Sequence, residues 1–241
     1  MNLTTTLVCL PFAGAGASFF RKWAPLAPEG LTLLPVQLPG REERFSETPF
    51  TEVGAAMDEA CPWVCERLDD DARVALFGHS LGAELAHELT RRLVARGVRV
   101  TRLFVSGAHA PRDRSVERIS ALDDAGFVAG LRRVAGFSHP AMNDPELLEI
   151  MLPLLRADSR MHEEYRSRHP DRLNVPVTSL RGRDDTLISA AEAVRWAGET
   201  SAGFDYAEID GSHMYLTDHT ASLLAAIATA LQPADSGSPV R

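Results

Sequence analysis

The sequence predicts an α/β fold with a mostly parallel central sheet flanked by helices. Short apolar runs alternate along the chain with longer stretches that have helical periodicity. Two runs, Leu31–Leu34 and Val74–Phe77, are continuous rather than alternating, which is typical of strands buried on both faces. A chain of 241 residues can form one three-layer domain. We expect that domain to cover residues 1–232, followed by a mobile tail rich in Pro, Ser and Gly at 233–241.

Each expected element follows from an apolar run or an amphipathic stretch between turn residues. The expected strands are Thr5–Leu10, Leu31–Gln37, Arg73–Phe77, Arg102–Ser106, Val175–Leu180 and Asp205–Ile209. The expected helices are Ser18–Leu26, Thr51–Leu68, Leu81–Arg96, Ser189–Glu199 and Leu216–Leu231. An insertion at about 111–172 breaks the alternation, with helical patterns at Asp123–Arg133 and Asp144–Arg168. Long insertions in compact domains usually serve binding, so we expect a helical lid rather than extra decoration of the core.

The composition argues against several classes of protein. A formal net charge of -8 is unlike the basic face of a general nucleic-acid binder. No apolar run is long enough for a transmembrane helix and no signal peptide is visible, so we expect a cytoplasmic protein. The spacing of the histidines and cysteines fits no zinc site, and we expect no metal or other cofactor.

A candidate nucleophile stands between a predicted strand and a predicted helix. The segment Gly78–Gly82 reads G-H-S-L-G, and a G-x-S-x-G sequence at such a turn describes the nucleophile elbow of the α/β-hydrolase fold. The serine of an elbow has a strained backbone, and the flanking glycines remove side chains that would collide there. The alternative is an ordinary serine at a helix N-cap. The context favours Ser80 as the nucleophile of a serine hydrolase.

The nucleophile needs a base and an orienting acid, which in this fold follow in the order acid, then histidine. His213 is the expected base, because it lies in a loop just after a predicted strand and the seven other histidines lack that placement. Asp185 is the expected acid, three residues after Gly182 in the G-x-x-D arrangement usual for this fold. Asp184 is the reserve, and Asp210 is disfavoured because only two residues separate it from His213.

Two backbone amides should stabilise the oxyanion of the tetrahedral intermediate. One is the N–H of Leu81, the residue after the nucleophile. The other is expected in the small-residue loop at 11–17, P-F-A-G-A-G-A, after the first strand. The glycines of this loop could instead suggest phosphate binding, but no G-K-[ST] ending follows, and Phe19 stands where G-x-G-x-x-G requires glycine.

Five motifs make the chain resemble type II thioesterases, the free-standing editing enzymes of polyketide and nonribosomal peptide assembly lines. They are C-L-P-F-A-G-A-G (Cys9–Gly16), Q-L-P-G-R-E-E-R (Gln37–Arg44), G-H-S-L-G-A (Gly78–Ala83), L-L-R-A-D (Leu154–Asp158) and G-S-H-M-Y-L (Gly211–Leu216). The resemblance runs from about Leu7 to Leu231, and P-G-R-E-x-R is far more specific than the elbow, since generic esterases do not carry it. The family pattern implies oxyanion amides at Ala13 and Leu81.

The resemblance implies hydrolysis of acyl thioesters on the phosphopantetheine arm of acyl or peptidyl carrier proteins by a monomeric enzyme. Thioesterase domains fused to assembly lines typically carry the acid right after the strand that follows the elbow helix; here that slot, Ser106–Ala108, has no carboxylate. Glu84 departs from the family, which usually has an apolar residue there; it is either solvated or alters the pocket.

Two other functions remain open from the sequence. One is a small-molecule carboxylesterase or lipase with the same triad, and the other is a non-catalytic module that binds carrier proteins. The second is disfavoured because every triad and oxyanion role is filled.

We also expect arginines of the insertion, among them Arg112, Arg114 and Arg118, to help dock an acidic carrier protein.

Overall fold

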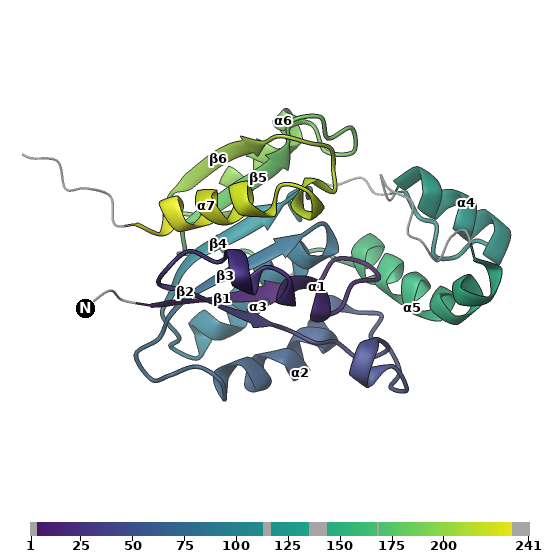
Figure 1. Ribbon diagram of the computed structural model, residues 1–241, viewed down its shortest axis with the longest axis horizontal. Helices are drawn as coiled ribbons and strands as arrows, with labels where there is room; N and C mark the ends of the chain where they lie inside the picture. Colours follow the sequence, from purple (N-terminus) through teal and green to yellow (C-terminus); the bar gives the residue numbers. More distant parts are fainter. Residues whose placement is uncertain (1–3, 113–116, 135–143, 168, 233–241) are drawn as a thin grey trace, which may run out of the picture.

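A single parallel sheet organises the chain in a computed structural model that describes residues 4–112, 117–134, 144–167 and 169–232. Its six strands lie in the order β2-β1-β3-β4-β5-β6, and every neighbouring pair is parallel (Figure 1). The strands are β1 (Thr5–Leu10), β2 (Leu31–Pro35), β3 (Arg73–His79), β4 (Val100–Ser106), β5 (Val177–Gly182) and β6 (Phe204–Ile209). The α/β fold and all six expected strands are confirmed, within two residues at most of their ends.

Helices cover both faces of the sheet (Figure 1). They are α1 (Ser18–Arg21), α2 (Val53–Cys65), α3 (Leu81–Ala95), α4 (Asp124–Val134), α5 (Pro145–Glu164), α6 (Ala190–Ala193) and α7 (Thr220–Leu231), with short 3₁₀ segments η1 (Ala24–Leu26), η2 (Glu42–Arg44), η4 (Val194–Glu199) and η5 (Tyr215–Thr217). Alternate residues of β3 serve the two faces: Val74 and Leu76 join the core under α2 and α3, while Ala75 and Phe77 join the core under α1 and α7.

The strand order reverses its direction at β1. From β1 the chain crosses to β2 on one side and then returns to β3 on the other side of β1. Loops that leave the carboxyl ends of β1 and β3 therefore diverge to opposite faces, and ligands of open α/β sheets bind at such a point. The loop after β1 and Ser80 after β3 both lie there.

Four of the elements expected from the sequence differ in the structure. Residues Leu31–Leu34 are not buried on both faces: β2 is an edge strand, so Thr32 is exposed and its neighbours are half-buried. The expected helix Ser18–Leu26 is split into α1 and η1, where Pro25 cannot continue the hydrogen-bond pattern. The expected helices at Ser189–Glu199 and Leu216–Leu231 likewise divide, into α6 with η4 and η5 with α7.

The insertion forms a helical pair at the end of the sheet where the strands have their carboxyl ends (Figure 1). Helices α4 and α5 share a small apolar cluster of their own, with Ile119, Phe127, Leu131 and Leu155. The expected helix Asp144–Arg168 ends at Glu164, because Tyr165 has an extended backbone with ψ 126. The expected tail, 233–241, lies outside the described residues. No helix in the described part of the chain has both the length and the apolar character to cross a bilayer.

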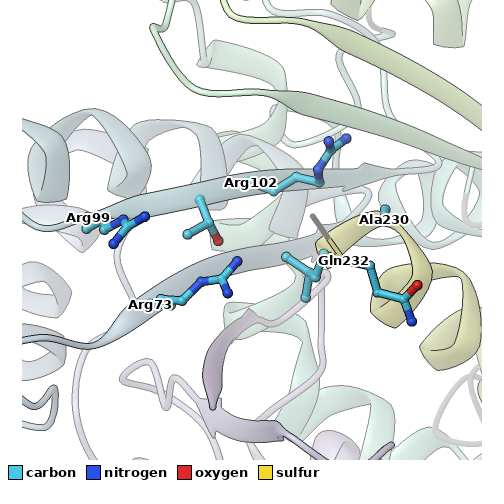
Figure 2. A pocket seen from close by; sticks show the side chains of 7 residues that line it. Arg73, Arg99, Arg102, Ala230 and Gln232 are labelled. Atoms are coloured by element: carbon cyan, nitrogen blue, oxygen red, sulfur yellow. The ribbon is translucent and has the colours of Figure 1, made fainter. Parts of the chain in front are cut away.

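A pocket of about 300 Å³ lies at the opposite end of the sheet and is lined by Arg73, Arg99 and Arg102 together with the end of α7 (Figure 2). Strand β3 begins at Arg73 and ends at His79, so the full length of the strand separates this pocket from Ser80. The candidate catalytic residues do not contribute to it.

Prediction for the strand-to-helix junction: Gly78→Ala should lower the free energy of unfolding by at least about 2 kcal/mol, because a Cβ at position 78 would overlap the backbone carbonyl of Gly82. The matched control is Gly198→Ala, where a Cβ meets nothing and the expected change is within about 0.5 kcal/mol. Urea unfolding of both variants measures the difference. Equal stability of the two variants would contradict the close packing of this junction.

Candidate active site

Ser80 lies on a tight turn between β3 and α3. Its backbone angles are φ 53 and ψ -121, a region that residues other than glycine rarely enter. The Ser80 N–H donates to the carbonyl of Ser106 at 2.8 Å, which ties the turn to the end of β4. A Cβ on Gly82 would lie 2.6 Å from the carbonyl oxygen of Leu10, so this glycine permits close approach of β1. The backbone has the geometry of a nucleophile elbow.

His213 and Asp185 form a hydrogen-bonded pair from two different loops. The distance from His213 Nδ1 to Asp185 Oδ2 is 2.8 Å, and both side chains are buried. The other carboxylate oxygen of Asp185 accepts from the backbone amides of Leu187 at 2.8 Å and Ile188 at 3.1 Å. Burial raises the pKa of Asp185, but hydrogen bonding and charge interaction with His213, together with the two amides, outweigh it, so the pKa falls below its ordinary value. The carboxylate stays ionised and fixes the imidazole tautomer.

Gly107 provides the space in which the elbow and the pair meet. It follows β4 with φ 52, and a Cβ there would lie 2.6 Å from Cε1 of His79 and 3.0 Å from Cε1 of His213. Ser106, the residue before Gly107, accepts the hydrogen bond from the Ser80 N–H. The elbow and His213 therefore converge at the end of β4. The Ser80 hydroxyl makes no hydrogen bond to another described residue. In unliganded enzymes this contact is often long and tightens when substrate binds.

A chain of buried hydrogen-bonded side chains lies next to the candidate base. His79 Nδ1 lies 2.9 Å from Ser106 Oγ, which lies 2.6 Å from the Tyr215 hydroxyl. The rings of His79 and His213 are 4.7 Å apart at their centroids. Burial, and then the neighbouring His213, lower the pKa of His79 well below its ordinary value, so His79 is neutral. No role was predicted for these residues, although His79 and Tyr215 lie inside the motifs around Ser80 and His213.

The loop after β1 lies beside the first turn of α3. Ala15 N–H donates to the Phe12 carbonyl at 3.0 Å, which closes a turn with Ala13 and Gly14 at its centre, and Gly14 has the φ of 76 that such a turn requires. Leu81 is the first residue of α3, where amide groups have no partner within the helix. Since Gly82 contacts Leu10 and Pro11, the loop and the amide of Leu81 lie close together.

The structure separates the alternatives for the acid. Asp184 is exposed, while Asp185 reaches His213. Asp210 is also exposed and pairs with Arg183 at 3.1 Å. No group of three or more His, Cys, Asp or Glu side chains within the described ranges is arranged to hold a metal ion.

Glu84 is buried rather than solvated. It lies on α3, and its Oε1 is 2.9 Å from Nδ1 of His162 on α5. The solvated alternative for this residue is therefore wrong. The contact could not be found in the sequence, because the two residues are far apart along the chain and neither belongs to a recognised motif.

The fold and this site define a serine hydrolase of the α/β-hydrolase class. A family model described as "Thioesterase domain" matches residues 5–231, and the chain belongs to that family and is a thioesterase. Thioesterase PikA5 of Streptomyces venezuelae is 38% identical over 218 residues, which are 90% of this chain and 77% of that protein.

Solved structures give the same result. The type II thioesterase BorB from the borrelidin biosynthetic cluster has 37% identity and a TM-score of 0.84, with 95% of this chain and 93% of that chain covered. YbtT, the type II thioesterase from the yersiniabactin pathway, has 33% identity and a TM-score of 0.84, with 94% and 92% covered. The resemblance to type II thioesterases of assembly lines is confirmed.

Prediction for the pH dependence of stability: wild type should lose stability more steeply than Asp185→Asn between about pH 5 and pH 3. A carboxyl whose pKa is lower in the folded chain stabilises it above its unfolded-state pKa of about 3.9, and that stabilisation is lost as the pH falls through the folded-state value. The difference in slope is at most about 1.4 kcal/mol per pH unit. Urea midpoints measured across this range test it.

Asp184→Asn is the control for that measurement, because its side chain is exposed and should leave the slope of the wild type unchanged. Identical slopes for wild type and Asp185→Asn would remove the inference that Asp185 stays ionised in the folded protein.

Proposed function

We propose that the enzyme hydrolyses acyl thioesters from the phosphopantetheine arm of acyl or peptidyl carrier proteins, and thereby clears stalled or misprimed assembly lines. Ser80 is the nucleophile, His213 the base and Asp185 the orienting acid. The observation that carries this proposal is the 2.8 Å contact of His213 with Asp185. It holds the His213 imidazole beside the strained turn of Ser80. The family supplies the class of bond, and thioesters need no metal or cofactor for this chemistry.

The reaction runs through an acyl-enzyme. His213 Nε2 removes the hydroxyl proton as Ser80 Oγ attacks the thioester carbonyl, and the imidazolium that forms is stabilised by Asp185. The amides of Ala13 and Leu81 donate to the oxyanion. The C–S bond breaks, and the pantetheine sulfur takes the proton from His213. Water, deprotonated by His213, then attacks the ester, and the proton returns to Ser80 as the acid leaves.

The insertion at about 111–172 serves this function as a lid over the acyl chain, and the protein acts as a cytoplasmic monomer. The arginines of the insertion differ in whether they are available to dock a carrier protein. Arg112 is held by Glu199 at 3.2 Å and by three backbone carbonyls, so its charge is already engaged. Arg118 is exposed, and Arg114 lies outside the described residues. Arg118 is the better candidate of the two described residues.

Prediction for the nucleophile: Ser80→Ala should lower kcat for an acyl-pantetheine by at least about 10³-fold, because no acyl-enzyme can form. The variant should also lose labelling by a fluorophosphonate, which reacts with activated serines. Ser46→Ala, at an exposed serine, is the control and should retain both activities. Retained hydrolysis by Ser80→Ala would remove Ser80 from the mechanism.

Prediction for the substrate class: at equal acyl chain, kcat/KM should be highest for the acyl-loaded carrier protein, lower for the acyl-pantetheine thioester and lowest for the matching oxygen ester. The carrier adds contacts outside the reacting centre, and such binding energy increases kcat/KM. Steady-state kinetics on the three substrates provide the test. An oxygen ester preferred by orders of magnitude would indicate a carboxylesterase, and binding of the carrier without turnover of any substrate would indicate a binding module.

A further inference from the structure

A buried ion pair joins two of the family motifs that have no part in the triad. Arg41, from the P-G-R-E-E-R segment, and Asp158, on α5, meet in a two-pronged contact, with Nη2–Oδ1 at 2.8 Å and Nη1–Oδ2 at 3.0 Å. The side chains are 4% and 0% exposed. The pair therefore lies inside the protein, at the join between the insertion and the core.

Both members of the pair also hold the backbone of the loop after β1. Asp158 Oδ2 accepts the N–H of Gly14 at 2.8 Å. Arg41 Nη1 donates to the carbonyl of Ala15 at 3.0 Å, and its Nε donates to the carbonyl of Pro39 at 3.3 Å. The two residues that follow Ala13 are thus both bound by the ion pair: the carboxylate accepts the N–H of Gly14, and the guanidinium donates to the carbonyl of Ala15.

The turn and the ion pair together fix the direction of the Ala13 amide. The Phe12 carbonyl accepts from Ala15 N–H, and in a trans peptide the N–H of Ala13 points opposite to that carbonyl. The next peptide is fixed by the bond from Gly14 N–H to Asp158. The orientations of the two peptide planes that flank Ala13 are therefore fixed, the first by the turn and the second by the ion pair.

Helix α5 also packs directly on this turn. A Cβ at Gly14 would lie 2.9 Å from Cδ2 of Leu155, which is three residues before Asp158 on the same helix. Buried ion pairs contribute little net stability, because desolvation offsets their attraction, and apolar replacements of both partners are often as stable. A pair that binds a functional backbone so directly is better explained by the geometry that it imposes.

We propose that Arg41 and Asp158 are positioning residues for the oxyanion hole: they orient the Ala13 amide, and they make this orientation depend on α5 being docked against the core. The inference rests on the proposed function, in which Ala13 stabilises the oxyanion. It assigns to the insertion a part in the chemical step in addition to covering the acyl chain.

The test uses the double variant Arg41→Met/Asp158→Leu in the full chain, with an acyl-pantetheine substrate. We expect kcat to fall about 10- to 100-fold with KM changed less than about threefold, because an oxyanion donor acts in the transition state. The inhibition constant of a trifluoromethyl ketone that forms a tetrahedral adduct with Ser80 should rise by the same factor as kcat/KM falls. Wild-type kcat and ketone affinity in a folded double variant would overturn the proposal.

Single conservative variants keep the test informative if the double variant fails to fold. Asp158→Asn retains an acceptor for Gly14 but not the charge, and Arg41→Lys retains the charge but not the fork. Each should lower kcat about 3- to 10-fold and weaken ketone binding in parallel. A purely structural role would lower only the urea midpoint and leave both quantities unchanged per folded enzyme, which would also overturn the proposal.

Arg160→Ala is the matched control, since Arg160 lies on the same helix in an exposed pair with Glu164 and should leave kcat at the wild-type value. Ser80→Ala distinguishes failure of the proposed function from failure of the positioning role. If that variant still hydrolyses the thioester, the proposed function fails. If it is inactive while the Arg41 and Asp158 variants are normal, only the positioning role fails.

Discussion

The strained backbone of Ser80 is the constraint on which the rest of the site depends. A non-glycine residue in a sparsely populated conformation costs about 1–3 kcal/mol and persists only where its surroundings fix it. Here β3 and α3 are both deeply buried and hold the two ends of the turn, while Gly78 and Gly82 leave room for the backbone to cross. The hydroxyl is thereby held at the tip of the turn, and the first amides of α3 face the same space.

The parallel sheet explains why residues distant in sequence gather around that turn. All six strands are parallel, so their carboxyl ends lie at the same end of the sheet. The segments that follow β1, β3, β4, β5 and β6 therefore emerge together. Each contributes one component of the candidate site: the loop around Ala13, Ser80, the room that Gly107 leaves for the imidazoles of His79 and His213, Asp185, and His213 itself. The reversal of strand order at β1 sends the segments after β1 and β3 to opposite faces of the sheet at this end, the kind of place where open α/β sheets bind ligands. The arrangement of the site is thus a consequence of topology, with local sequence choosing which side chain occupies each strand end.

Local patterns in the sequence carried much of this information. The strands, the elbow at Ser80 and the choice of Asp185 over Asp184 each depended on residues within a short window. The edge position of β2 could not be found in this way, because apolar content does not say how many neighbours a strand has. The pairing of Arg41 with Asp158 and the burial of Glu84 against His162 were also missed, since both are contacts between distant segments.

Both of these contacts are polar pairs that join the insertion to the core. Helices α4 and α5 have their own apolar cluster, whereas the seam between α5 and the core contains Arg41–Asp158, Glu84–His162 and the bond from His87 to Tyr165 at 2.8 Å. Met161 and Tyr165 add apolar contact with the main core. Polar pairs are directional and can be replaced by water when a seam opens, while burying them unpaired is costly. The docked position of α5 is therefore defined by directional polar contacts as well as by apolar packing.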